Sequence, residues 1–181
     1  MTTILYSICQ YLSSFIVFER PAIYVIIISV NEAYAMASDK KLIKELLIVG
    51  KKIEQCGLVI GEGGNISARQ GKMAYIKSRG VSMAAAKDAD YIPVDINTGR
   101  PLDPKSKPST EVPMHIDCYK SRKDIGAVIH THPIFITALG ISGISFKSLS
   151  YEAKVYLKSD IAAVPYVKPG SAALGRAVGK A

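Results

Sequence analysis

The sequence predicts an α/β domain, in which helices and short strands alternate along the chain. Its 181 residues are 49% hydrophobic and 21% charged, as in a folded globular domain. Apolar residues recur at helical spacing between residues 42 and 53. Farther along, short apolar runs are bounded by turn residues, which is typical of strands. This pattern excludes a disordered chain, a collagen and a coiled coil.

The first regular element is an amphipathic helix. Ser38 is a good N-cap, Asp39 stands in the first turn, and Gly57 closes the segment. The apolar positions between them lie on one face of a helix: Leu42, Ile43, Leu46, Leu47, Val49 and Ile53. We therefore expect this helix to cover a hydrophobic core.

The rest of the chain predicts an alternation of strands and helices. Residues 66–69 and 73–77 form a hairpin around the corner at 70–72, and strands follow at 91–96, 125–132 and 161–164. Helices are expected from Ser109 to Tyr119, where Pro113 falls in the first turn, and at 135–139 and 171–180. The chain contains no internal repeat.

The formal net charge of +8 comes from the chain beyond residue 35. The cations are scattered, with no run of five or more, and this favours solvated faces over a nucleic-acid-binding stripe. We therefore expect no nucleic-acid partner. Anionic small molecules are compatible with this charge.

Residues 1–35 are apolar and differ sharply in composition from the remainder of the chain. Their charged residues are Glu19, Arg20 and Glu32, and the longest apolar stretch, 22–30, is about half the roughly 20 residues that a membrane-spanning helix needs. A signal peptide is disfavoured, because the region before Arg20 is itself apolar and too long. We interpret 1–35 as an N-terminal appendage, or as a stretch outside the functional protein, and 36–181 as the functional domain.

The three cysteines, Cys9, Cys56 and Cys118, are odd in number and widely separated. They form no Cys-x-x-Cys pair, which disfavours a disulfide framework or a structural zinc site. A reducing compartment, the cytoplasm, fits this pattern best.

The sharpest local motif is His130-Thr131-His132, at the end of the apolar strand at 125–129. Side chains of a strand alternate between faces, so the two imidazoles project to the same side, about 6 to 7 Å apart along the strand. This spacing suits two ligands of one metal ion. Two strand-end histidines without a ligand are an equally good interpretation of the motif alone.

Ser109-Thr110-Glu111 stands at the start of the predicted helix. Hydroxyls, free amides and the helix dipole favour an anion there. Glu111 is either an ordinary first-turn carboxylate or, near a metal, a general base. His115, one turn later, is expected to pack or to form hydrogen bonds rather than to bind metal.

Two glycine-containing turns are candidates for a phosphate site. Backbone amides around Gly64 and the side-chain amide of Asn65 could line it. In the turn at 78–80, the guanidinium of Arg79 can grip phosphate in a bidentate manner, next to Gly80. Each turn has the alternative interpretation of a simple structural corner.

The order of these motifs resembles the class II aldolase and adducin head-domain family. The resemblance rests on Gly-Asn-Ile-Ser at 64–67, Ser-Thr-Glu at 109–111 with His115 four residues later, Ala-Val-Ile-His-Thr-His-Pro at 127–133, Val-Pro-Tyr at 164–166 and Pro-Gly-Ser at 169–171. It extends over roughly residues 42–178. It implies a three-layer α/β fold with a central, mostly antiparallel sheet flanked by helices, and a homotetramer with sites between subunits.

The resemblance also implies roles for individual residues. His130 and His132 would bind a divalent cation, most often zinc, and Glu111 would act as acid and base. Tyr151, contributed by a neighbouring subunit, would protonate the aldehyde oxygen. The substrate phosphate would lie among Asn65, Arg79, Gly80, Ser109 and Thr110, although Arg79 stands where the family has threonine or serine.

The activity implied by the resemblance is metal-dependent cleavage of a phosphorylated ketose of the fuculose phosphate type. Alternatives within the family are a sugar-phosphate epimerase, a dehydratase or a decarboxylase. A further alternative is a non-catalytic, adducin-like module or an inactive remnant. The family's third metal histidine belongs to a His-Gly motif that would follow Ala181, so we expect the domain to be incomplete at its C-terminus.

Overall fold

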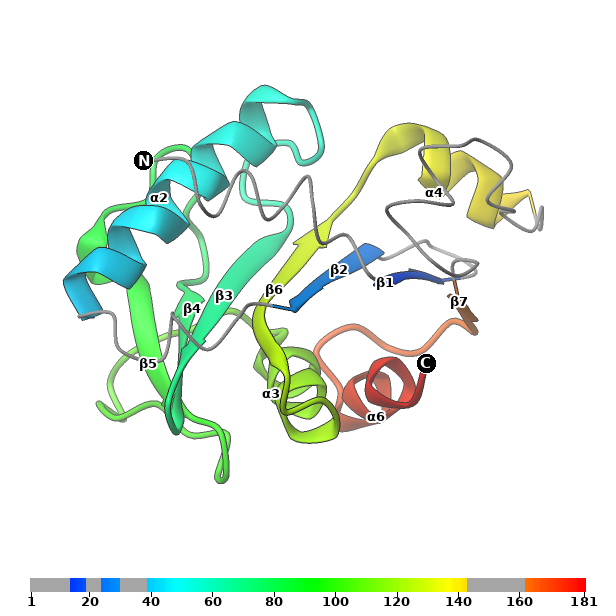
Figure 1. The fold of residues 1–181 in the computed structure, drawn as a ribbon. Coiled ribbons are helices and arrows are strands. Elements are labelled where there is room, and N and C mark those ends of the chain that lie inside the picture. The colour runs from blue at the N-terminus through cyan, green and yellow to red at the C-terminus, as the bar shows by residue number, and fades with distance from the viewer. Residues whose placement is uncertain (1–13, 19–23, 30–38, 143–161) are drawn as a thin grey trace.

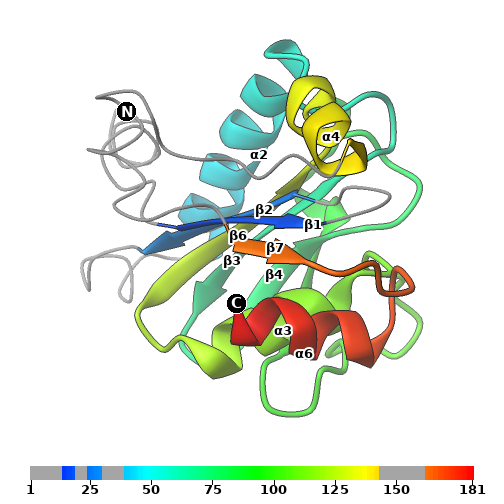
Figure 2. The ribbon, with the colours of Figure 1, turned by 90° about the vertical axis from the view of Figure 1, so that its right-hand side faces the viewer.

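A computed structural model describes residues 14–18, 24–29, 39–142 and 162–181. Their strands form one seven-stranded sheet in the order β5-β4-β3-β6-β2-β1-β7. The sheet is the middle of three layers: α2 and α4 lie on one face, and α3 and α6 lie on the other (Figures 1 and 2). The predicted α/β class with a flanked, mostly antiparallel sheet is confirmed.

The elements have the following bounds in chain order. The strands are β1 (Ser14–Phe18), β2 (Tyr24–Ser29), β3 (Asn65–Gln70), β4 (Met73–Lys77), β5 (Tyr91–Asp95), β6 (Ile125–Thr131) and β7 (Ala162–Val164). The helices are α2 (Asp39–Gln55), a short 3-10 turn η2 (Asp88–Asp90), α3 (Val112–Ser121), α4 (Ile134–Ile141) and α6 (Ala172–Lys180). No helix in this described part of the chain is long and apolar enough to cross a membrane.

Strand β6 lies at the centre of the sheet and ends at the candidate site. It pairs antiparallel with β3 on one side and with β2 on the other, and only the pairing of β1 with β7 is parallel. The register of β3 and β6 sets Asn65 directly opposite His130. The sheet therefore joins two motifs that are far apart in sequence.

Two hydrophobic cores, one on each face, hold the layers together. Alternation along β6 sends Val128 to the core under α3 and α6, and Ile129 to the core under α2. In β4, Ile76 faces the first core and Tyr75 the second. Because these strands place apolar side chains on both faces of the sheet, helices must pack on both sides to bury them.

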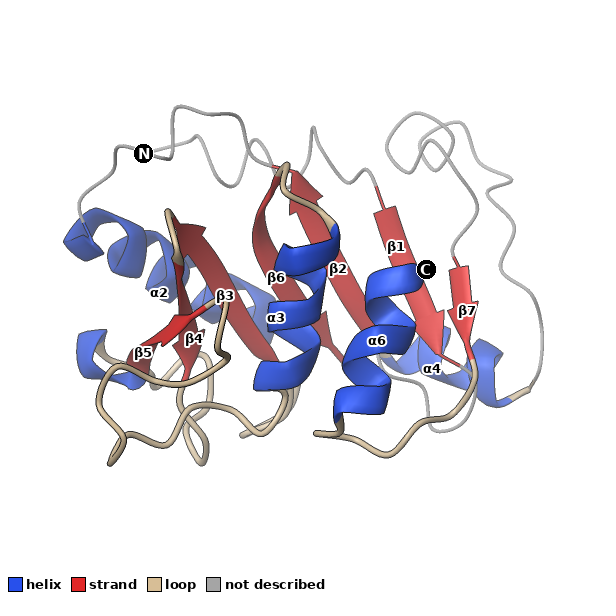
Figure 3. Ribbon diagram, turned by 90° about the horizontal axis from the view of Figure 1, so that it is seen from below, coloured by secondary structure: helices blue, strands red, loops and turns tan. Residues whose placement is uncertain are grey.

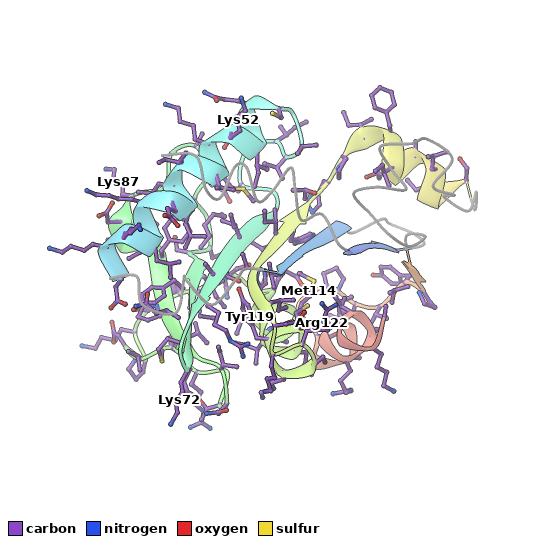
Figure 4. The ribbon with its side chains drawn as sticks, viewed as in Figure 1. Lys52, Lys72, Lys87, Met114, Tyr119 and Arg122 are labelled. Carbon is purple, nitrogen blue, oxygen red and sulfur yellow. The ribbon has the colours of Figure 1, made fainter. Side chains whose placement is uncertain are left out.

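Helices α3 and α6 lie side by side beneath the sheet (Figure 3). Glycine permits this close approach, because a Cβ at Gly175 would lie 2.7 Å from the carbonyl oxygen of Pro113. Met114 and Tyr119 are buried on the sheet-facing side of α3 (Figure 4). Helix α6 is capped by Ser171, whose hydroxyl accepts a hydrogen bond from the Leu174 amide at 3.1 Å.

Two features differ from the sequence predictions. Helix α3 begins at Val112 rather than directly after Ser109, because residues 109–111 form a turn in which the Ser109 hydroxyl accepts from the amide of Glu111. Strands β1 and β2 lie within residues 1–35, for which no strand was predicted, and they extend the sheet beyond β6. The boundary near residue 36 and the role of 1–35 stay predictions.

Exposed lysines occur on several elements, and five of them lie on α2: Lys40, Lys41, Lys44, Lys51 and Lys52. Lys52, Lys72 and Lys87 project outward from α2, from the β3–β4 turn and from the segment before η2 (Figure 4).

Candidate active site

One cavity of about 710 Å³ lies at the end of β6. All the predicted site residues that the structure describes line it: Asn65, Arg79, Gly80, Ser109, Thr110, Glu111, His130 and His132. They come from four segments of the sequence. Tyr151, the remaining predicted site residue, lies outside the described residues. The structure thus brings eight of the nine together, and their roles stay predictions.

Backbone hydrogen bonds join the two segments predicted to hold phosphate. The Ser109 amide donates to the carbonyl oxygen of Lys77 at 2.9 Å, and the Arg79 amide donates to that of Lys107 at 3.0 Å. These bonds flank an isolated antiparallel bridge between Ser78 and Pro108, just beyond the end of β4, and they hold the turn at 78–80 beside Ser109 and Thr110. The guanidinium of Arg79 and the hydroxyls of Ser109 and Thr110, which suit an anion, therefore line the same cavity from adjacent segments.

The two histidines of the strand end face each other. Their Nε2 atoms are 3.0 Å apart, and their ring centroids are 4.7 Å apart. Two imidazoles that bind one tetrahedral zinc ion, at about 2.0–2.1 Å each, hold their nitrogens about 3.3 Å apart. The pair therefore suits a shared divalent cation.

Burial keeps both rings neutral, which is the form that binds metal. It holds the pKa of His130 well below its usual value, and the neighbouring His132 and His115 add to the effect. Partial burial also lowers the pKa of His132. Within the described ranges, no set of three or more His, Cys, Asp or Glu side chains is arranged to hold a metal. The described residues thus offer two predicted ligands, His130 and His132, and do not complete a set of three.

Glu111 is buried at the wall of the cavity. Its Oε2 has no hydrogen-bond partner among the described residues. Burial raises the pKa of this carboxyl, and a hydrogen bond from the Gly170 amide opposes the rise in part. A carboxyl with a raised pKa and an unengaged oxygen holds its proton more readily than an exposed one, which suits a group that takes up and releases a proton.

A chain of buried polar side chains leads away from His130. Asn65 contacts the Nδ1 of His130 through its Nδ2 at 3.1 Å, and its Oδ1 contacts the Nε2 of His115. The Nδ1 of His115 lies 2.6 Å from the Ser67 hydroxyl, which lies 2.8 Å from that of Tyr119. The prediction that His115 forms hydrogen bonds is confirmed. Both ends of the Asn65 amide are used by histidines, which the sequence did not indicate.

Lys77 lines the cavity but was not predicted as a site residue. It is 2% exposed, and its ammonium donates to the carbonyl oxygens of Ser78, at 3.2 Å, and Val81. Burial lowers its pKa, while the carboxylates of Glu62, Asp90 and Glu54 partly oppose this. Lys77 stands at the end of a predicted strand and next to the turn at 78–80, and this position could have indicated that it lines the site.

Comparison with known proteins gives the family of this chain. Residues 44–181 match the Class II Aldolase and Adducin N-terminal domain family. The chain belongs to this family. The L-fuculose phosphate aldolase of Methanocaldococcus jannaschii is 31% identical over 137 residues, which are 76% of this chain and 74% of that protein.

Two further relatives show how much of the family's length is matched. The 5-methylthioribulose-1-phosphate/5-deoxyribulose-1-phosphate aldolase of Escherichia coli is 32% identical over 140 residues, 77% of this chain and 65% of that protein. A solved structure of an L-fuculose 1-phosphate aldolase is 34% identical, with a TM-score of 0.52 over 58% of this chain and 50% of that one. The match thus spans about half of that structure. The resemblance seen in the motifs and the class II aldolase fold are confirmed.

Proposed function

We propose that this chain contributes the active site of a metal-dependent aldolase that cleaves a phosphorylated ketose. The observation that carries the proposal is the single cavity. One side of it offers Arg79 with hydroxyls and amides for a phosphate, and another offers the facing Nε2 atoms of His130 and His132 beside Glu111. Relatives of similar identity are aldolases of different ketose phosphates, which supports the substrate class rather than one sugar.

In this mechanism, the protein's own groups hold the substrate and move two protons, one at C3 and one at the C4 oxygen. Arg79, Ser109 and Thr110 bind the phosphate at C1 and so fix the position of the ketone at C2. A divalent cation on His130 and His132 would polarise this ketone and lower the energy of the enediolate. As the C4 hydroxyl gives its proton to Tyr151, the bond between C3 and C4 breaks, C4 leaves as the aldehyde, and the electron pair of the bond stays with C3. The protonated Glu111 carboxyl then donates its proton to C3, and dihydroxyacetone phosphate leaves.

Two groups of the proposed site come from outside the described residues. Tyr151, from a neighbouring subunit of a homotetramer, exchanges a proton with the aldehyde oxygen. A third metal ligand completes the cation site. Both features rest on the family resemblance.

Cleavage of a panel of ketose 1-phosphates by the purified protein with added Zn²⁺ tests the proposal. The panel includes L-fuculose 1-phosphate and 5-deoxyribulose 1-phosphate, and release of dihydroxyacetone phosphate is measured. Glu111→Gln should lower the rate by about 10²- to 10⁴-fold, as expected for loss of a general acid–base, while it leaves zinc binding unchanged. Epimerised substrate, without release of dihydroxyacetone phosphate, would instead assign an epimerase. Zinc binding without turnover of any ketose phosphate would contradict an enzymatic role.

A further inference from the structure

The Asn65 amide lies between two buried imidazoles and contacts both of them. His115 is completely buried and His130 is 4% exposed. The nitrogens that face Asn65 are the Nε2 of His115 and the Nδ1 of His130. The four ring nitrogens face an amide, a hydroxyl and another imidazole, with no carboxylate among these partners, so each buried ring is neutral and carries one proton.

A primary amide has one accepting end and one donating end. When Oδ1 faces His115, the Nε2 of that ring must carry the proton that it donates. The Nδ2 of Asn65 then donates to a bare Nδ1 of His130, whose own proton must be on Nε2. When the amide is turned over, both requirements reverse, and each ring carries its proton on Nδ1.

We propose that Asn65 is a positioning residue that couples the tautomers of His115 and His130, so that both rings are protonated on Nε2 or both on Nδ1. The surrounding groups accept either state. The Ser67 hydroxyl can donate to a bare Nδ1 of His115 or accept from a protonated one, and it has Tyr119 as its second partner. The amide orientation in the structure corresponds to the Nε2 state, in which the Nε2 of His130 can donate to the Nε2 of His132, 3.0 Å away.

The coupling reaches the cation site, and this part rests on the proposed function. His130 can offer the Nε2 lone pair that faces the cavity only when its proton is on Nδ1. The amide must then present Oδ1 to His130, and His115 must move its proton to Nδ1. No proton enters or leaves the set. A cation bound at His130 thus fixes the tautomer of His115, although the ring of His115 does not line the cavity.

Nitrogen NMR of ¹⁵N-histidine-labelled protein tests the coupling directly. The chain has three histidines, so three rings are observed. In metal-free wild-type protein, His115 and His130 should both be bare on Nδ1. Opposite tautomers in the two rings would overturn the proposal, and this outcome requires no variant to fold.

Asn65→Asp offers a carboxylate that accepts from both sides. The facing nitrogens, Nε2 of His115 and Nδ1 of His130, should then both carry protons. His115 is then protonated on Nε2 and His130 on Nδ1, so the two rings no longer have the same tautomer. A facing nitrogen that stays bare in a folded variant would contradict the coupling. Asn97→Asp adds the same charge in the exposed turn after β5 and should leave both rings as in the wild type.

Addition of Zn²⁺ to wild-type protein gives the second readout. Both buried rings should move to the Nδ1-protonated form together. A change in His130 while His115 stays protonated on Nε2 would overturn the coupling. If Zn²⁺ changes the tautomer of none of the rings, the proposed cation site is wrong. The spectra of the metal-free protein still test the coupling between His115 and His130.

Discussion

At the scale of single residues, the site depends on polar side chains buried inside the core. An unpaired polar group in this environment costs about 1–3 kcal/mol, and hydrogen bonds offset that cost. His115, Ser67 and Tyr119 are completely buried and bond to one another or to Asn65. The same bonds that satisfy these groups also fix the orientation of the ring of His130.

His115 makes the stability of the protein depend on pH. Burial lowers its pKa to about 3 from 6.5, so below pH 6.5 the unfolded chain binds a proton that the folded chain does not. Its contribution to stability is complete above pH 6.5 and is lost as the pH falls towards about 3. From pH 7.5 to 5.5 this loss is about 1.4 kcal/mol.

Urea unfolding of wild-type protein and of His115→Gln at both pH values measures this contribution. The variant should be less stable at pH 7.5, but it should lose about 1.4 kcal/mol less than the wild type on acidification. An equal loss in the two proteins would show that another group carries the dependence.

The facing histidines lead to a prediction about metal binding. Removal of either ring should lower zinc affinity by at least about tenfold, because each ring is one of the two proposed ligands. Titration of His130→Ala and His132→Ala with Zn²⁺ against a competing chelator measures the change. Lys72→Ala, in an exposed turn, should match the wild type. Loss of zinc binding in His115→Gln together with full retention in His132→Ala would show that the ligand assignment is wrong.

At the scale of elements, local patterns predicted most of the structure around the site. The helix after Ser38, the hairpin of β3 and β4, strand β6 and helix α6 each occur within a few residues of their predicted bounds. These segments have clear periodicity and turn residues, so the local sequence determines them. The strand–turn–helix order at 125–141 was predicted for the same reason.

The features that were missed depend on contacts between distant segments. Strand β2 falls in a continuous apolar run, whose lack of alternation hides a strand, and its place beside β6 is a long-range pairing. The start of α3 is set by backbone bonds from 107–109 to the β4 end. Both uses of the Asn65 amide depend on the β3–β6 register and on α3, so no local pattern could predict them.

Gly64 controls how closely β3 approaches the end of β6. Its φ is 63°, and a Cβ there would lie 2.5 Å from the carbonyl oxygen of His130 and 2.6 Å from Val59 Cγ1. Gly64→Ala should destabilise the protein by about 3 kcal/mol, from the left-handed backbone and the clash together. It should also displace Asn65 and weaken zinc binding.

The matched control is Gly71→Ala. Gly71 has a similar φ of 59°, but a Cβ there meets nothing within 4 Å. This variant should therefore lose only about 1 kcal/mol, from backbone strain alone. Urea unfolding of the two variants separates strain from steric contact, and equal losses would contradict the close approach at Gly64.

At the scale of the whole molecule, the exposed apolar surface beside the cavity is relevant to assembly. Phe135 is 86% exposed and Ile134 is 65% exposed, both on α4. Ile134 and Ile141 also line the cavity. Large exposed apolar side chains next to one another are typical of protein interfaces. Helix α4 therefore offers a surface for the expected homotetramer, in which a neighbour's Tyr151 would reach the site.

Phe135→Ser tests this role of α4. If the helix packs against a second subunit, the variant should dissociate into smaller species at concentrations where the wild type is assembled, because a buried aromatic contributes several kcal/mol to an interface. Light scattering coupled to size-exclusion chromatography measures the mass. Leu102→Ser is the matched control. Leu102 is likewise a large, exposed apolar residue, at 65%, but it lies on the turn after β5 and does not line the cavity. A similar loss of mass in both variants would indicate general destabilisation, and an unchanged mass in Phe135→Ser would exclude this residue as an interface anchor.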